Sequence, residues 1–462
     1  MSVHDILLLT TAICSILLLI LLIVSKLHLH PLLALLIVSL IVGMVSGIKL
    51  EDLADSIKTG AGNTFGSVGL TVALGAMFGR VLADSGVSGQ IAEQILSHST
   101  NRNVTWLMGF AAFIIGIPMF FEVGLIILLP LIFTVASRIE REGNVKGSPY
   151  VLIGVPVIAA LSSMHGMVPP HPGPLVAIAG FHANLGLTMI YGIICAIPAI
   201  ILAGPIYARF IVPRLSVRPD EQLLAQYADA PSGMSQKKQP VSAFSAWLVT
   251  LLPMLIMLGR TAAETLLPTR SFIYQLAVFA GDPVIAMLIG LLAAIAFFGY
   301  ARGNNGKQIR QTVGESLKPI AGIMLIIAGG GAFAQVLVDS HVGDAIVHLS
   351  SDFSLPAIAL GWVIAALLSI TTGSATVGIV GATGLLTPMV TADPSINTAL
   401  LVVAIGSGSL FFNFANHAGF WLVKESFSMT MGETFKTITV IQSIVGLVGL
   451  VMALLLNLLP LF

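Results

Sequence analysis

The amino-acid sequence predicts an all-α, polytopic membrane protein. Of its 462 residues, 56% are hydrophobic and only 9% are charged, which is far more apolar than an ordinary soluble domain. Ten apolar stretches reach the roughly twenty residues that a helix needs to cross a bilayer. The formal net charge is zero, so the composition gives no support for a nucleic-acid partner.

Eight of the apolar stretches are continuous and predict single membrane helices. They lie near residues 6–25, 31–48, 61–84, 187–212, 244–262, 283–300, 316–340 and 432–459. Two more spans, 149–184 and 398–425, are interrupted and predict broken helices. Two double segments, 104–138 and 355–391, are interrupted by Gly or Pro and predict either re-entrant hairpins or pairs of crossing helices. The total is ten spans plus two hairpins, or up to fourteen crossings.

The basic residues of the short loops predict the orientation of these spans. Lys26 follows the first span, and no basic residue precedes that span, so we expect the amino terminus outside. Counting forward places three basic segments inside, namely Arg138–Lys146, Arg214–Lys238 and Arg302–Lys318. The agreement of all three supports the span count.

The chain contains two related halves. Gly75–Val87 reads GAMFGRVLADSGV and Gly330–Val342 reads GGAFAQVLVDSHV, with seven of thirteen positions identical. The charge count places the two copies in opposite orientations. We therefore predict an inverted repeat, with residues 1–212 as the first copy, 213–242 as a cytoplasmic linker and 243–462 as the second copy.

Each half contains two segments that cannot form an intact helix. They are GIPMFFEVG (Gly116–Gly124) and MHGMVPPHPGP (Met164–Pro174) in the first half, and TTGSATVG (Thr371–Gly378) and NFANHAG (Asn413–Gly419) in the second. Interrupted backbone is tolerated at membrane depth only where it is buried in protein or lines a watery cavity. The freed helix ends can meet an anion. We therefore expect a binding site where these segments meet near the middle of the membrane.

Several of these segments resemble those of the gluconate permeases. The resemblance is specific in FEVGLIILLPLIF (Phe121–Phe133), HGMVPPHPGP (His165–Pro174), GGGAFAQVLVDS (Gly329–Ser340), GSATV (Gly373–Val377) and GFWLVKE (Gly419–Glu425), and it extends over nearly the whole chain. It implies a proton symporter for gluconate or a related sugar acid, or for D-serine as in one branch of the family. It also implies the bacterial cytoplasmic membrane and the inverted-repeat fold of the wider ion-transporter superfamily.

Glu122 is the sharpest single candidate for carrying the coupling proton. A carboxylate inside an apolar run costs about 2.5–3.5 kcal/mol at mid-membrane on insertion scales, and such residues usually face a cavity or a partner. His171, between the prolines, is the second candidate because imidazole titrates near neutral pH. The alternative for Glu122 is a structural carboxylate held by backbone donors.

The remaining candidates are polar side chains and glycines beside the breaks, which suit the hydroxyl groups and the carboxylate of a sugar acid. The predicted substrate-binding residues are His165, His171, Gly173, Thr372, Gly373, Ser374, Thr376, Asn413, Asn416 and His417. Small hydroxylated residues also join helices without any ligand, so that alternative stays open for each of them. At His417 the chain departs from the gluconate permeases, which often carry an acidic residue there.

The sequence therefore predicts a secondary transporter rather than an enzyme, with no cofactor. Its partners would be a small carboxylate, protons and the lipid bilayer, and the exposed faces of the early helices could form a homodimer. One alternative is a sodium/proton or other ion exchanger of the same superfamily, which should rely on paired carboxylates where this chain has Glu122. A remote alternative is an intramembrane metalloenzyme that uses His165, His171 and His417, although these lack a zinc-binding HExxH pattern.

Overall fold

The computed structural model is helical throughout the part of the chain that it describes. It describes residues 10–459, except for 12, 13, 16, 20, 24–28, 98, 101, 102, 144, 221–240, 319, 341–355, 415 and 416. The predicted first span therefore lies only partly within the described residues. Most of the predicted linker, 213–242, lies outside them.

The helices of the first half cover the described part of the predicted spans, and two further helices, residues 50–64 and 87–96, lie largely outside those spans. In chain order the helices are α2 (Pro31–Val45), α3 (Leu50–Thr64), α4 (Leu70–Asp84), α5 (Val87–Leu96), α6 (Val104–Gly116), α7 (Phe121–Glu142), α8 (Pro149–Met167), α9 (Pro172–Phe181), α10 (Leu185–Ile201) and α11 (Tyr207–Ile211). The π-helical turn η1 (Phe65–Gly69) joins α3 to α4, and η2 (Leu202–Ile206) joins α10 to α11. A 3-10 turn, η3 (Val212–Arg214), follows α11.

The second half repeats this pattern of long helices and interrupted ones. Its helices are α13 (Ala243–Leu266), α14 (Phe272–Ala280), α15 (Pro283–Ala294), α16 (Gly306–Leu317), α17 (Ala321–Asp339), α19 (Ala357–Thr372), α20 (Ala375–Ala392), α21 (Thr398–Gly408), α22 (Ala418–Ser426), α23 (Met431–Thr434) and α24 (Val440–Asn457). The π-helical turn η4 (Ile295–Gly299) extends α15, and η6 (Phe435–Thr439) joins α23 to α24. A 3-10 turn, η5 (Tyr300–Arg302), follows η4.

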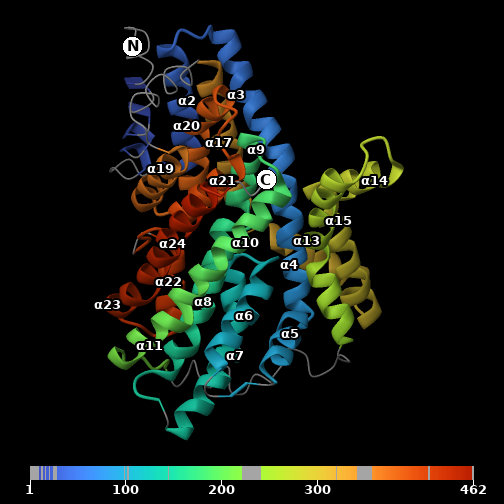
Figure 1. Ribbon diagram of the computed structural model, residues 1–462, viewed down its shortest axis with the longest axis vertical. Helices are drawn as coiled ribbons and strands as arrows, with labels where there is room; N and C mark the ends of the chain where they lie inside the picture. The colour runs from blue at the N-terminus through green and yellow to red at the C-terminus, as the bar shows by residue number, and fades with distance from the viewer. Residues whose placement is uncertain are drawn as a thin grey trace.

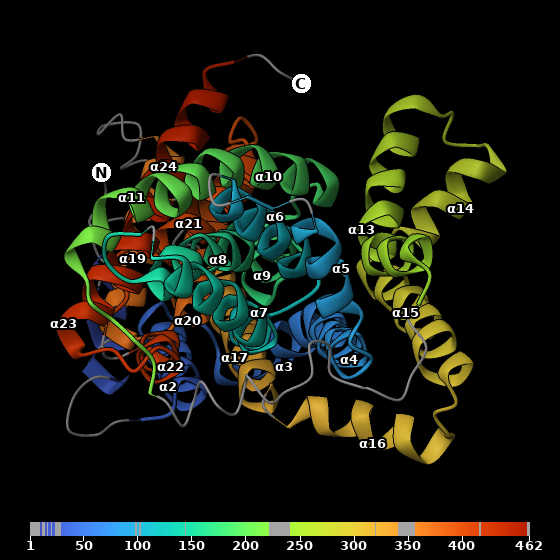
Figure 2. The same cartoon turned by 90° about the horizontal axis from the view of Figure 1, so that it is seen from below.

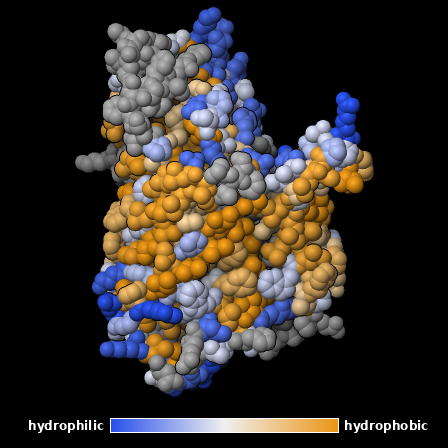
Figure 3. Space-filling view, viewed as in Figure 1, coloured by the Kyte–Doolittle hydropathy of each residue, from blue (hydrophilic) through white to orange (hydrophobic). Residues whose placement is uncertain are grey.

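Among the described residues, seven helical stretches are long and apolar enough to cross a membrane. An eighth results if α4 and α5, which are bent by 64° at their junction, count as one span. The shorter apolar helices include α6, α19 and α21, which belong to the predicted hairpins and to the second broken span. On the face seen in Figure 3, hydrophobic side chains form a broad band across the molecule, with hydrophilic ones gathered above and below it. The all-α polytopic fold is therefore confirmed.

The two broken spans form the centre of the molecule. Nearly every residue of α8 is buried, and α8 packs against α6, α7, α10 and α24. Helix α21 is buried from its second residue to its last and packs against α9, α10, α19 and α24. Both helices are apolar on all sides, which is typical of helices surrounded by other helices. By contrast, α13, α14 and α15 stand at one side of the molecule (Figures 1 and 2).

Two of the basic segments that were predicted to lie inside meet at one end of the molecule. Arg218 forms an ion pair with Glu140 at the end of α7, with 3.1 Å between Nε and Oε1. The Ser148 hydroxyl donates to the carbonyl of Val217. In Figure 1 the ends of α7, α11 and α23 lie together at the lower end. The two segments therefore lie on the same side of the molecule, and the assignment of that side as the inside stays a prediction.

The aligned VLxDS segments have the same local structure in both halves. Helix α4 ends at Asp84 and α17 ends at Asp339, and a serine follows each as the C-cap. Each serine hydroxyl donates to a carbonyl three residues earlier, at 2.9 Å in both cases. Each aspartate accepts from the side chain four residues before it, Arg80 at 3.0 Å and Gln335 at 3.0 Å. The repeat boundaries at 212 and 243 stay a prediction.

Candidate functional site

The first hairpin tip places Glu122 at the beginning of a helix. Helix α6 ends at Gly116, and Pro118 follows in the turn before α7 begins at Phe121. Proline cannot continue the helix because it lacks a backbone N–H and clashes with the preceding turn. Glu122 therefore lies in the first turn of α7, where the helix dipole favours a negative charge. Its side chain is partly buried.

The first break separates α8 from α9. Met167 is the last residue of α8, Val168 is extended, and the helix resumes only at Pro172 with His171 as its N-cap. Proline is favoured at the first position of a helix because its missing N–H would have no partner there. The proline cluster thus ends one helix and begins the next.

The buried side chain of His171 joins this break to the hairpin tip. Its Nε2 lies 2.9 Å from the carbonyl oxygen of Gly116, 55 residues earlier in the chain. A carbonyl oxygen only accepts hydrogen bonds, so Nε2 of His171 carries the hydrogen. The ring of Phe120 lies 6.3 Å from the His171 ring, measured between centroids.

The ring of His165 lies next to that of His171. The two centroids are 5.6 Å apart and the rings meet edge to face. Within the described part of the chain, the Nδ1 atom of His165 is buried and has no hydrogen-bond partner. The hairpin tip packs against the same helix, since a Cβ added at Gly124, two residues after Glu122, would meet the side chain of Leu161 on α8.

The second break brings a third histidine to the same place. His417 is the N-cap of α22, and its Nδ1 accepts a hydrogen bond from the N–H of Gly419 at 3.1 Å. Helix α22 packs against α7, and a Cβ added at Gly419 would lie 3.2 Å from the Phe121 ring. Glu122 follows Phe121 in the chain, so this contact brings the hairpin tip and the second break together. Glu122, His165, His171 and His417 therefore form one cluster, which we call the histidine cluster.

The second hairpin tip has the turn chemistry that its sequence predicts. Gly373 ends α19 with φ +70, in the left-handed region that favours glycine. Ser374 is the N-cap of α20 and accepts from the N–H of Val377 at 3.3 Å. Thr376, in the first turn, is partly buried. The side chain of Thr372 and the whole of Asn416 lie outside the described residues.

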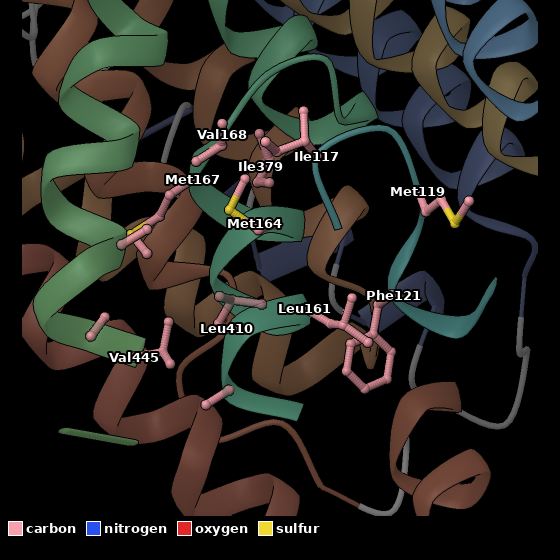
Figure 4. Packing of buried hydrophobic residues seen from close by; sticks show 14 of the residues in the cluster. Ile117, Met119, Phe121, Leu161, Met164, Met167, Val168, Ile379, Leu410 and Val445 are labelled. Carbon is pink, nitrogen blue, oxygen red and sulfur yellow. The ribbon is translucent and has the colours of Figure 1, made fainter. Parts of the chain in front are cut away.

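Glycines bring the interrupted elements of the two halves into backbone contact. A Cβ added at Gly406 of α21 would overlap with the carbonyl of Gly166 on α8. A Cβ added at Gly173 would overlap with the side chain of Ile379 on α20, so this predicted substrate-binding residue lies at a helix contact. Apolar side chains around the first break, including Leu161 and Ile379, are shown in Figure 4.

Asn413 is held by hydrogen bonds within the protein. It is 2% exposed, its Oδ1 accepts from the Ser369 hydroxyl at 3.0 Å, and its Nδ2 donates to the carbonyl of Ser409 at 3.0 Å. The Ser369 hydroxyl also lies 2.6 Å from the Ser409 carbonyl. These bonds join α19 to the end of α21, and a direct role of Asn413 in substrate binding stays a prediction.

Gln442 of α24 is a buried polar residue that was not among the predicted site residues. Its side chain is 2% exposed, and its Nε2 donates to the hydroxyl of Ser162, one turn before His165, at 3.2 Å. Its Oε1 is buried and has no partner among the described residues. In the sequence, Gln442 is a lone amide in the apolar run VIQSIVGLVGL, and this feature could have marked it as a candidate site residue.

Two cavities of the described structure lie away from the histidine cluster. One, of about 170 Å³, lies between α4, η4 and α16 and is lined by Asp84, Ser85, Phe298, Gln308 and Thr312 among others. The other, of about 220 Å³, lies beside α2. Among the described residues, no group of three or more His, Cys, Asp or Glu side chains is arranged to hold a metal ion.

The sequence matches one family along almost its whole length. Residues 6–459 match the family described as GntP family permease. The chain is 42% identical to a gluconate permease of Pseudomonas aeruginosa, with 98% of each chain covered. It is 39% identical to a high-affinity gluconate transporter of Escherichia coli (95% of this chain, 97% of that one) and 36% identical to the L-idonate transporter of the Gnt-II system of the same organism (92% and 93%).

Two solved structures share the fold. The YdaH transporter of Alcanivorax borkumensis matches with a TM-score of 0.64 at 15% identity, covering 93% of this chain and 98% of that one. MtrF of Neisseria gonorrhoeae, described as illuminating a class of antimetabolite efflux pumps, matches with a TM-score of 0.63 at 11% identity, covering 93% and 96%. At these identities the likeness concerns the fold alone.

Proposed function

This chain belongs to the GntP permease family, and from that membership and the site geometry we propose that it takes up gluconate or a related small hydroxylated monocarboxylate by proton symport. It is a multi-pass transporter of the bacterial cytoplasmic membrane and not an enzyme. Substrate class and proton coupling are the two parts of the proposal.

The observation that carries the proposal is the histidine cluster at the ends of interrupted helices. Helices α7, α9 and α22 all begin at the cluster, and their N-terminal ends carry partial positive charge. Such ends attract carboxylates, as do protonated imidazoles. Ser374 and Thr376 of the second tip supply hydroxyl groups that suit a polyhydroxylated chain. The names of the relatives point to the same class, since gluconate and L-idonate are both hydroxylated monocarboxylates.

Glu122 supplies the physical reason for coupling. Two like charges about 5 Å apart repel by roughly 3 kcal/mol at an effective dielectric constant of about 20. A substrate carboxylate that enters beside ionised Glu122 meets this repulsion, and protonation of Glu122 removes it. By this argument the anion binds on the order of a hundredfold more tightly to the protonated transporter. A proton then travels with each anion.

The proposal is tested by a competition panel in proteoliposomes that contain the purified protein. Uptake of labelled gluconate is measured under an imposed pH gradient, with unlabelled L-idonate, other aldonates, uronates, tetronates or D-serine as competitors. We expect at least one hydroxylated monocarboxylate to be accumulated and to compete, and simple apolar monocarboxylates to compete poorly.

The same vesicles test the exchanger alternative. An ion exchanger would move protons when sodium is added, without any carboxylate. Failure of every acid in the panel, with and without sodium, would overturn the proposed function.

A further inference from the structure

Three helices that carry residues of the histidine cluster also run from it toward one end of the molecule. Helices α7 and α22 begin at the cluster, and α8 runs the opposite way and reaches the cluster at His165. We call the far end of these helices the linker end, because residues 215–220 of the predicted linker bond there to the beginning of α8 and to the turn after α22. Helices α7, α8 and α22 therefore line the path between the cluster and the linker end.

The ring of Phe427 lies between two of these helices. Phe427 directly follows α22 and is 0% exposed. Its ring lies 6.0 Å from that of Phe133 on α7, edge to face, and a Cβ added at Gly154 on α8 would overlap with it. Phe133 is eleven residues after Glu122 on α7. Gly154 is likewise eleven residues before His165 on α8, so the ring lies roughly 16 Å from the cluster along both helices.

Residues 215–220 cross the linker end as an extended segment, which we call the strap. It is the light-green trace that follows α11 in Figure 2. Leu215 and Val217 are 3% and 5% exposed and Pro219 is buried, whereas the residues between them are exposed, as expected of an extended segment with one face on the protein. The carbonyl of Val217 accepts from the hydroxyl of Ser148, the N-cap of α8. These buried residues anchor the strap on the first half.

The polar end of the strap reaches the second half directly beside Phe427. Arg218 pairs with Glu140 of α7, with 3.1 Å between Nε and Oε1. The N–H of Asp220 then donates to the hydroxyl of Ser428, the residue after Phe427, at 3.2 Å. Both contacts are exposed, and exposed ion pairs contribute little to stability. This end of the strap can therefore release while its buried part stays in place.

We propose that Phe427 is a gate between the histidine cluster and the linker end, and that the strap is the latch that keeps the gate closed. For the path to open, the turn at Ser428 must move away from α7 and α8 and take the ring with it. Release of the Arg218 and Asp220 contacts permits this movement. Alternating access requires such a closure at one end of the path whenever the site is open to the other. The inference goes beyond the proposed function, because the gate depends on no particular substrate.

The gate is tested with a reporter thiol on its cluster side. Val423→Cys places the thiol four residues before Phe427, at a position that is 0% exposed. The two native cysteines are replaced by Cys14→Ser and Cys195→Ala, so that only the reporter reacts. The rate of its reaction with iodoacetamide is measured on the purified protein in detergent, without any substrate.

Two substitutions release the latch, and a matched one leaves it in place. Arg218→Glu turns the ion pair with Glu140 into a repulsion. Ser428→Gly removes the hydroxyl that the strap binds, at a position where glycine suits the φ of +53. Arg141→Glu is the control, because it makes the same charge change at an exposed residue of α7 whose side chain donates to a carbonyl of its own helix.

We expect the reporter thiol to react about fivefold faster in Arg218→Glu and in Ser428→Gly, which is the factor that the loss of one net hydrogen bond gives. In Arg141→Glu it should react at the rate of the parent. A parental rate in either latch variant would overturn the proposal, as would an equal acceleration in the control.

A second measurement decides the matter if the reporter variant does not fold. Hydrogen–deuterium exchange of residues 419–429 is compared in the otherwise native chain. Faster exchange in the two latch variants alone supports the proposal, and exchange that is unchanged in them contradicts it. Neither readout needs a substrate, so a protein that accumulates no acid from the panel would count against the proposed function and not against the gate.

Discussion

The first broken span (α8–α9) and the second (α21–α22) both resume at a histidine that is followed, after one residue, by glycine. In the first span His171 reaches across to the hairpin tip and donates to the Gly116 carbonyl. In the second span His417 turns back and caps its own helix at Gly419. The same His-x-Gly pattern therefore joins two separate elements in the first half and caps its own helix in the second half.

The two halves also differ in the polar groups that lie near the hairpin tip and the break. The first half supplies Glu122, His165 and His171, which can exchange protons. Around its own tip and break the second half supplies hydroxyls, two amides and His417. Under the proposed function, the proton chemistry belongs to the first half, while the second half offers neutral hydrogen-bonding groups. The predictions below test that division.

The largest effect is expected where the two broken spans touch. Gly406→Ala places a Cβ against the backbone carbonyl of Gly166, which cannot move aside as a flexible side chain could. Overpacking of this kind costs about 1–3 kcal/mol or more, so we expect a clear loss of folded protein. The measurement is the yield of monodisperse protein and its melting temperature. Gly89→Ala is the control, because a Cβ added at this helical glycine has open space, and it should be neutral or slightly stabilising.

Glu122→Gln should have the next largest effect. Without the carboxyl group no proton is carried, so accumulation under a pH gradient should be abolished while exchange of labelled gluconate continues. Glu142→Gln is the matched control, since Glu142 is the last residue of the same helix and is exposed. Normal accumulation by Glu122→Gln would remove this residue from the mechanism.

An intermediate effect is expected from the charge at position 417. Both His417→Asn and His417→Asp can cap α22, because Asn and Asp are favoured N-caps. Only the aspartate adds a negative charge next to Glu122, so it should raise the KM for gluconate by about tenfold or more relative to the asparagine variant. Equal KM values in the two variants would show that His417 does not face the anion.

The smallest effect on transport is expected from Ser369→Ala. This change leaves Oδ1 of Asn413 without its donor in a buried place, which costs about 1–3 kcal/mol of stability. We expect a lower melting temperature and an almost unchanged KM for gluconate. A KM that rises strongly in a stable variant would indicate that Ser369 holds Asn413 in position to bind the substrate.

The sequence predicted the apolar helices and both breaks, because apolar runs are local features and proline and glycine act locally. The polar helices α3 and α16 were not predicted. The capping roles of Gly373 and Ser374 follow from the same local chemistry. Contacts between distant segments could not be predicted in this way. The His171 to Gly116 bond depends on how α6 packs against α8, and the inward turn of Asn413 depends on Ser369 of another helix. Gln442 could have been found from the sequence as a lone amide in an apolar run. Its hydrogen bond to Ser162 could not, because that bond depends on how α24 packs against α8.

The central claim is tested most directly by the accumulation ratio of labelled gluconate in proteoliposomes at zero membrane potential, measured as a function of the imposed pH difference. For one proton per anion, the account predicts that the ratio rises about tenfold for each pH unit, with no requirement for sodium. A ratio that stays at one under every pH difference, while exchange shows that the acid binds, would contradict proton-coupled transport.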